Sequence, residues 1–236
     1  MMRIEIVDLP AGRVGTAAVS LPPADAVVVI DVIRAFTTAA EAFARGAESI
    51  SCVADTESAL ELKAVGAVDR CMGEDRGLHI DGFEFDNSPR SLPDDLSGVR
   101  FAQRTSNGTR GLALVESRFA FAAGATTASA VAAAVLDVVS DLDDPSVALL
   151  CTDSVRPEDR ACAEFIAATL RGRPADSEQL RAAVLAAGEI HVAAMRRRDE
   201  ARAQSILADV ELCADVDRHG FAMRARAVGT SQVLTI

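Results

Sequence analysis

A stretch near the N-terminus combines a buried-strand pattern with residues that suit phosphate or metal chemistry. Residues 26–30 form an unbroken apolar run, which predicts a strand buried on both faces. Asp31 and Arg34 follow it, and Thr37 and Thr38 come next, where a helical pattern begins. A carboxylate and a guanidinium beside a helix start suit an anion or a metal–phosphate group. The plainer alternative is that Asp31 and Arg34 pair with each other while a threonine caps the helix.

Three other predicted strands also end in unusually polar turns. The strands at 69–72, 100–104 and 146–151 lead into Glu74-Asp75-Arg76, Arg104-Thr105-Ser106-Asn107-Gly108-Thr109 and Thr152-Asp153. In open α/β sheets, ligands bind outside the carboxyl ends of the strands. If the four strands are parallel neighbours, their turns line one crevice. We therefore expect one polar site at this edge of the sheet.

Each turn has an alternative reading. Asn107-Gly108 suits a turn that tolerates positive φ, and it lacks the Gly-Lys-Ser/Thr ending of a P-loop, so nucleotide binding is not indicated. Ser106, Thr109 and the nearby amides could still hold phosphate or sulfonate oxygens. Glu158 and Asp159 suit the first turn of a helix, where negatively charged side chains interact favourably with the helix dipole. The turns indicate a site mainly because they occur together.

The other reactive side chains show no catalytic spacing. The five cysteines include no C-x-x-C pair, and no cysteine has an arginine six positions on, as a cysteine phosphatase would. Asp31 lacks the second aspartate of a D-x-D phosphatase. The three histidines, His79, His191 and His219, are scattered, so we expect neither a zinc site nor a histidine nucleophile. The remaining carboxylates and arginines favour an oxygen-binding ion such as Mg²⁺.

Alternating strand and helix patterns predict the scaffold. Strands are expected at 3–7, 26–30, 49–53, 69–72, 100–104, 119–123, 146–151, 223–227 and 232–236. Helices are expected at 39–45, 55–65, 109–115, 125–139, 157–170, 177–195 and 200–213, and long loops at 10–23 and 73–93. This order predicts an α/β fold, three-layer α/β/α with a largely parallel or mixed sheet. Residues 1–236 would form a single domain, with two small lobes as the alternative.

Composition limits the partners. The 24 Lys and Arg against 35 Asp and Glu give a net charge of −11, which argues against nucleic acid and anionic membranes as partners. The longest apolar stretch, 125–139, is too short and too interrupted to span a bilayer. An odd number of cysteines with no preceding signal peptide predicts reduced thiols and a cytoplasmic protein.

The sequence resembles the 2-phosphosulfolactate phosphatases of coenzyme M biosynthesis. Five segments carry this resemblance in the family's order: Asp31 to Thr38, Gly73 to Gly77 with Gly82 to Pro89, Thr105 to Arg110, Thr152-Asp153 with Glu158 to Ala163, and Asp209 to Cys213. The resemblance implies a Mg²⁺-dependent hydrolase of a distinct α/β type, similar to acid phosphatases and expected to be a homodimer.

One loop departs from the family pattern. The family usually has Gly-Glu-Arg-Gly-Gly, whereas here Asp75 takes the arginine's place and Arg76 a glycine's, and Asp86 replaces a later glycine. Moving a guanidinium by one residue re-aims it, and Asp75 would repel an anionic substrate. We therefore expect weaker activity on 2-phosphosulfolactate and a preference for phosphate esters with fewer acidic groups.

These observations predict a Mg²⁺-dependent phosphatase that acts on a small anionic phosphate ester, in the first place 2-phosphosulfolactate, which it would convert to 3-sulfolactate and phosphate. The expected metal ligands are Asp31, Glu74 and Asp153, and the catalytic set is Asp31, Arg34, Asp153 and Asp159. Substrate would contact Arg34, Thr37, Thr38, Arg76, Arg104, Ser106, Asn107, Gly108 and Thr109. Two alternatives remain: a non-catalytic module that binds small anions, and a metal-dependent hydrolase or lyase of another substrate.

Overall fold

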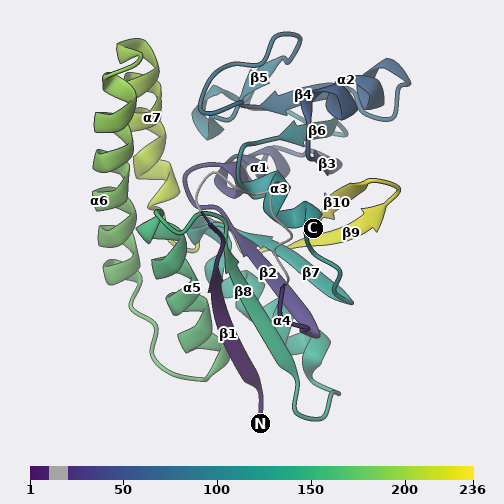
Figure 1. Ribbon diagram of the computed structural model, residues 1–236, viewed down its shortest axis with the longest axis vertical. Coiled ribbons are helices and arrows are strands. Elements are labelled where there is room, and N and C mark those ends of the chain that lie inside the picture. Colours follow the sequence, from purple (N-terminus) through teal and green to yellow (C-terminus); the bar gives the residue numbers. More distant parts are fainter. Residues whose placement is uncertain (11–20) are drawn as a thin grey trace.

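The protein is described by a computed structural model that covers residues 1–10 and 21–236, and these form a ten-stranded sheet with helices on both faces (Figure 1). The α/β prediction is confirmed. The predicted loop at 10–23 lies mostly outside the described residues. In spatial order the strands are β1 (Arg3–Asp8), β8 (Ser146–Cys151), β2 (Ala26–Ile30), β7 (Phe119–Ala123), β9 (Met223–Val228), β10 (Ser231–Thr235), β3 (Ser49–Val53), β6 (Arg100–Arg104), β4 (Arg70–Gly73) and β5 (Phe85–Asp86).

The sheet consists of two parallel halves joined by an antiparallel hairpin. Strands β1, β8, β2 and β7 are parallel to one another, and so are β3, β6, β4 and β5. The β9–β10 hairpin pairs antiparallel with β7 on one side and β3 on the other. Three antiparallel pairings in succession reverse the direction, so the two halves point opposite ways along the sheet. The sequence suggested four adjacent parallel strands, but the four polar turns follow two separate parallel pairs, β2–β8 and β4–β6, one in each half.

Although the two halves of the sheet point in opposite directions, curling of the sheet brings the four polar turns together. Residues that follow β2 and β8 in one half, and β4 and β6 in the other, line a single cavity. Figure 1 shows the first half below, the second half above, and the yellow β9–β10 hairpin at the side between them. Strong twist and coil are the usual behaviour of large mixed sheets. The carboxyl edges of the two halves thus face each other across the cavity.

Strand β2 shows why the central strand is apolar throughout. Ala26, Val28 and Ile30 pack in one core with helices α4 (Ala128–Val139) and α5 (Pro157–Leu170). Val27 and Val29 face a second core. Alternate side chains of a strand point to opposite faces, so a strand covered on both sides needs apolar residues at every position.

Two helices fill the concave side of the sheet between its halves. Helices α1 (Ala35–Ala44) and α3 (Gly108–Ala113) contribute Phe36 and Leu112 to the second core, which also contains Phe101 of β6. Helix α2 (Thr56–Ala64) covers the outer face of the second half through Ala59. Both α1 and α3 begin directly at a polar turn, so this packing fixes the turns at the cavity.

A helical hairpin stands along one side of both halves (Figure 1). It consists of α6 (Ser177–Arg196) and α7 (Glu200–Cys213), each capped at its start by an aspartate, Asp176 and Asp199, which accepts a backbone hydrogen bond. The two helices approach closely at Gly188, where a Cβ would lie 2.3 Å from Val210. One end of α6 packs in the α4–α5 core through Leu180. The hairpin therefore reaches from one half of the sheet toward the other.

No helix within residues 1–10 and 21–236 is both long enough and apolar enough to cross a membrane. The predicted 125–139 segment is α4, preceded by a short 3-10 turn. All five cysteines are buried and free, as the sequence suggested.

Candidate functional site

The two carboxyl edges of the sheet enclose a cavity of about 520 Å³. A cavity of this size suits a small organic ligand. Its walls come from the turns after β2, β4, β6 and β8, and from the α6–α7 hairpin. The lining residues are Asp31, Ile33, Arg34, Glu74, Arg76, Gly77, Asn87, Ser106, Asn107, Asp153, Arg156, His191, Ala194, Met195, Arg198 and Ile206.

Asp31 lies in the wall of this cavity at the end of β2, with 7% of its surface exposed. Its Oδ1 accepts the N–H of Ala35, the first residue of α1, at 3.1 Å, and it does not pair with Arg34. Gly108 has no Cβ, and a Cβ there would lie 2.9 Å from Asp31 Oδ2. Burial, with a smaller contribution from Glu74, raises the pKa of Asp31 to about 6. An acid in this state is poised to exchange a proton near neutral pH.

Arg34 is held by a residue that sequence reasoning did not assign to the site. Its Nη1 donates to Asp209 Oδ2 of α7 at 2.5 Å, and both side chains are buried. The other carboxylate oxygen of Asp209 accepts from Ser88 Oγ at 3.0 Å and from Arg90 N–H at 3.3 Å. A buried ion pair with its remaining oxygen satisfied fixes the direction of the guanidinium. The plainer reading, an Asp31–Arg34 pair, is therefore wrong.

Glu74 ties together the two polar turns of the second half of the sheet. Its Oε1 accepts Ser106 N–H at 2.6 Å, and its Oε2 accepts Ser106 Oγ at 3.1 Å and the N–H of Gly77. Arg104 braces the same loop, because its Nη1 donates to the carbonyl of Glu74 at 2.6 Å and to Asp75 Oδ1 at 2.9 Å. The loop is thus fixed by hydrogen bonds before any ligand binds.

These hydrogen bonds change the interpretation of the loop after β4, where the sequence departs from the family pattern. Asp75 does not line the cavity, and its carboxylate pairs with Arg104. The sequence predicted that the negative charge of Asp75 would meet an anionic substrate. That placement of the charge is wrong, because Asp75 lies outside the cavity wall and is paired with Arg104. Arg76, in contrast, lines the cavity with a φ of +51°, in the left-handed region that glycine adopts most easily. Asp86 is also paired, with Arg202 at 3.2 Å, and His79 Nδ1 lies 2.7 Å from its other carboxylate oxygen.

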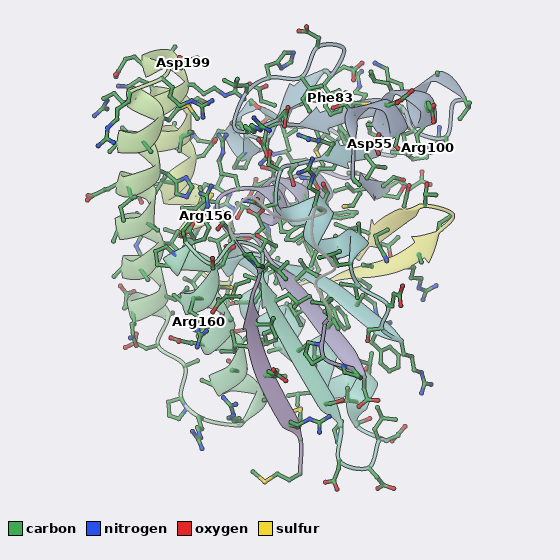
Figure 2. The ribbon with its side chains drawn as sticks, viewed as in Figure 1. Asp55, Phe83, Arg100, Arg156, Arg160 and Asp199 are labelled. Atoms are coloured by element: carbon green, nitrogen blue, oxygen red, sulfur yellow. The ribbon has the colours of Figure 1, made fainter. Side chains whose placement is uncertain are left out.

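Asp153 and Arg156 form the wall after β8, where α5 begins. Figure 2 labels Arg156 at this point. Arg156 Nε lies 3.4 Å from Asp153 Oδ2, and its Nη1 lies 2.6 Å from His191 Nδ1 of α6. Behind them, His191 Nε2 is 3.2 Å from Glu158 Oε1. Burial, followed by the repulsion of Asp31 and Asp153, raises the pKa of Glu158 to about 7. Burial, followed by the charges of Arg156 and Arg34, lowers the pKa of His191 to about 3, so His191 is neutral at pH 7.

Asp159 lies behind the cavity rather than in its wall. Its Oδ1 accepts Val32 N–H at 2.8 Å, and its Oδ2 accepts Thr152 Oγ1 at 3.1 Å. Burial, followed by the charges of Asp31 and Glu158, raises its pKa well above the usual value. Asp31, Glu158 and Asp159 therefore oppose each other's ionisation. The dipole reading of Glu158 and Asp159 as first-turn acids does not account for this crowding.

The structure brings seven of the predicted site residues to the cavity wall: Asp31, Arg34, Glu74, Arg76, Ser106, Asn107 and Asp153. It places six others behind the wall: Thr37, Thr38, Arg104, Gly108, Thr109 and Asp159. Thr37 donates to the carbonyl of Val32 at 2.8 Å, and Thr109 exchanges hydrogen bonds with Thr105. These hydroxyls form hydrogen bonds within the two turns, and their contact with substrate stays a prediction.

Four polar cavity residues were missed from the sequence: Asn87, Arg156, His191 and Arg198. His191 lies on α6, and Arg198 lies between α6 and α7. Their exposure depends on how the α6–α7 hairpin packs, which no local pattern encodes. Arg156 offered one usable signal, because it precedes Pro157 at a helix start next to the predicted Asp153.

The donors fit a magnesium ion only in part. No three His, Cys, Asp or Glu side chains among the described residues converge closely enough to hold a metal ion by themselves. Magnesium, however, is often held by one or two carboxylates together with water and substrate phosphate. The mutual repulsion of the buried acids would be relieved by a cation. Asp31 and Asp153 suit this role better than Glu74, because three hydrogen bonds already occupy the Glu74 oxygens.

Comparison with known proteins shows which family the chain belongs to. The chain is 35% identical to a probable 2-phosphosulfolactate phosphatase of Bacillus subtilis over 155 residues, which is 65% of this chain and 67% of that protein. It is 38% identical over 97 residues to one from Cyanothece, covering 40% of each chain. The family described as 2-phosphosulpholactate phosphatase matches residues 17–225, a range that contains every residue lining the cavity. The chain therefore belongs to the 2-phosphosulpholactate phosphatase family.

Proposed function

We propose that the protein is a phosphatase that hydrolyses a small anionic phosphate ester, with 2-phosphosulfolactate as the first candidate. The proposal rests on one observation above all. Asp31, a buried acid with a raised pKa, shares a cavity with two arginines, Arg34 and Arg156, each fixed by an acid partner. Phosphoryl transfer depends mainly on positioning and electrostatic stabilisation, and this arrangement supplies both. Family membership supports the same reaction.

Each group in the cavity has a role in this proposal. Arg34 and Arg156 hold the phosphoryl oxygens, because pre-oriented guanidinium groups bind phosphate with directed hydrogen bonds. Asn107 supplies a neutral donor at the opposite wall, next to Ser106, whose N–H and hydroxyl both donate to Glu74. Asp31 in its ionised form accepts a proton from the attacking water, or attacks phosphorus itself, and the net reaction gives an alcohol and inorganic phosphate.

We further propose that the enzyme depends on Mg²⁺, with Asp31 and Asp153 as the carboxylates that hold it. The ion would neutralise the phosphoryl oxygens and lower the pKa of a bound water. The support is the excess of buried carboxylates at this end of the cavity, which a cation would stabilise. The predicted homodimer and cytoplasmic location belong to the same proposal, and the buried free cysteines agree with a reducing compartment.

A phosphate-release assay tests the proposal. Purified protein is incubated with 2-phosphosulfolactate, and with simpler phosphate monoesters, in Mg²⁺ and in EDTA. We expect phosphate release that stops in EDTA and returns when Mg²⁺ is added. Undiminished phosphate release in EDTA would contradict the proposed dependence on Mg²⁺. Tight binding of 3-sulfolactate without turnover of any ester would instead favour the non-catalytic anion-binding module, and turnover of unrelated substrates alone would favour another hydrolase or lyase.

A further inference from the structure

The four arginines of the cavity fall into two groups. Arg34 pairs with Asp209 at 2.5 Å, and Arg156 lies 3.4 Å from Asp153 and 3.9 Å from Glu158. The charge of each is therefore balanced by protein acids. Arg34 is buried and Arg156 is 26% exposed, and both line the cavity with the buried acids Asp31 and Asp153.

Arg76 and Arg198 form the other group. Both line the cavity and both are exposed to solvent, so they belong to its rim. Among the residues that the structure describes, neither has a carboxylate within 4.0 Å. Residues 11–20 contain no Asp or Glu that could serve instead. The rim thus carries two positive charges without protein partners, whereas acids crowd the buried end.

The two arginines come from segments that contact each other. Arg198 lies between α6 and α7, where its N–H donates to the carbonyl of Met195 at 2.8 Å. The Cε of Met195 in turn packs against Gly77, next to Arg76, since a Cβ on Gly77 would lie only 2.8 Å from it. Arg202 of α7 donates to the carbonyl of Gly77 and pairs with Asp86. Figure 2 labels Asp199, the neighbour of Arg198, at the end of the hairpin that lies beside this loop.

We infer that Arg76 and Arg198 are specificity-determining residues that bind an acid group, a carboxylate or a sulfonate, on the organic part of the ester. The phosphoryl group would lie at the buried end, and the acid group would meet the two uncompensated charges at the rim. The orientation rests on the proposed phosphatase function, whereas recognition of the acid group does not. Guanidinium groups without a competing protein partner are free to form paired hydrogen bonds with a planar or tetrahedral anion.

The test is direct binding, measured by calorimetry in Mg²⁺-containing buffer. The probes are 3-sulfolactate, lactate with a carboxylate only, isethionate with a sulfonate only, and inorganic phosphate. The variants are Arg198→Gln and Arg76→Gln. The matched control is Arg197→Gln, which removes an adjacent exposed charge that does not line the cavity. We expect each test variant to weaken 3-sulfolactate binding at least tenfold and phosphate binding less than twofold, with the control unchanged.

The lactate and isethionate arms show which acid group the rim binds, since only the group in contact should lose affinity. Equal weakening of phosphate and 3-sulfolactate would place these arginines at the phosphoryl group and overturn the inference. So would wild-type affinity in both variants, or no 3-sulfolactate binding by the wild type. A hydrolysis assay separates the two proposals. If the variants change binding as expected but no ester is hydrolysed, the phosphatase function is refuted, and recognition of the acid group by Arg76 and Arg198 is not. If both variants hydrolyse the ester as fast as the wild type, recognition of the acid group by Arg76 and Arg198 is refuted, and the phosphatase function is not.

Discussion

Asp31 is the residue on which the proposed chemistry most depends, and its environment does not favour its ionised form. Burial raises its pKa to about 6, and the acids Glu74 and Asp159 lie close by. A buried acid whose pKa is higher in the folded than in the unfolded state lowers stability once the pH exceeds the unfolded value. Such a cost is typical of a site kept for function rather than for folding.

We predict that Asp31→Asn abolishes turnover and leaves the free energy of unfolding unchanged or raises it by up to roughly 2 kcal/mol at pH 7. The amide removes the ionisation cost, and its oxygen can still accept the N–H of Ala35. Phosphate release and urea denaturation measure the two effects. Asp69→Asn, which alters an exposed pair with Arg100, is the control and should retain full activity. A strongly destabilised Asp31→Asn with normal specific activity would assign Asp31 a structural role.

The α6–α7 hairpin is the element that completes the site. It supplies His191, Arg198 and three apolar wall residues, Ala194, Met195 and Ile206. It is attached to the rest of the cavity by the Arg34–Asp209 pair and by the contacts of Arg202 with the loop after β4. The pair joins residues 175 positions apart in the chain. The position of the hairpin therefore depends on a few buried polar contacts as well as on packing.

Removing one partner of the buried pair should be costly, and removing both less so. We predict that Asp209→Ala lowers the free energy of unfolding by about 3–5 kcal/mol, because it leaves Arg34 buried without a counter-charge. Urea denaturation measures the loss. The double variant Arg34→Met/Asp209→Leu should recover a large part of it while remaining inactive. If the single variant loses less than about 1 kcal/mol, the pair does not anchor the hairpin.

At the scale of the whole molecule, the helix between the two halves of the sheet is fastened to the C-terminal part of the chain. Glu41 of α1 is 3% exposed and accepts from Arg218 Nε at 2.8 Å, with His219 Nε2 at 2.9 Å. Burial alone would raise the pKa of Glu41, but the bonds to His219 and Arg218 outweigh it and lower the pKa to about 2. This contact joins α1 to the segment that precedes the β9–β10 hairpin.

A lowered carboxyl pKa gives a stability contribution that is complete above the unfolded value, about 4.5, and is lost as the pH falls toward about 2. We therefore predict that thermal stability falls in this window, and that Glu41→Gln is less stable than wild type at pH 7 but falls less steeply. Melting temperatures from pH 7 to pH 2.5 measure this. Parallel curves for the two proteins would show that Glu41 does not contribute to the acid sensitivity.

The local patterns of the sequence determined the elements and the polar turns. The apolar run of β2 and the helical pattern after Asp55 depend on neighbours within a few residues, and the structure confirms both elements. The convergence of the turns after β2, β4, β6 and β8 was also predicted correctly, although for a sheet with four adjacent parallel strands.

The tertiary structure alone decided how those turns meet. The β9–β10 hairpin reverses one half of the sheet, and curling brings the two carboxyl edges back together. The same long-range packing gave Arg34 the partner Asp209 instead of Asp31, paired Asp75 with Arg104, and turned His191 and Arg198 toward the cavity. The positions of strands, helices and turns are set by short-range interactions. Sheet curvature and the choice of ion-pair partner depend on residues far apart in the chain. The sequence therefore identified most of the polar groups at the site, and the fold determined which of them face a ligand.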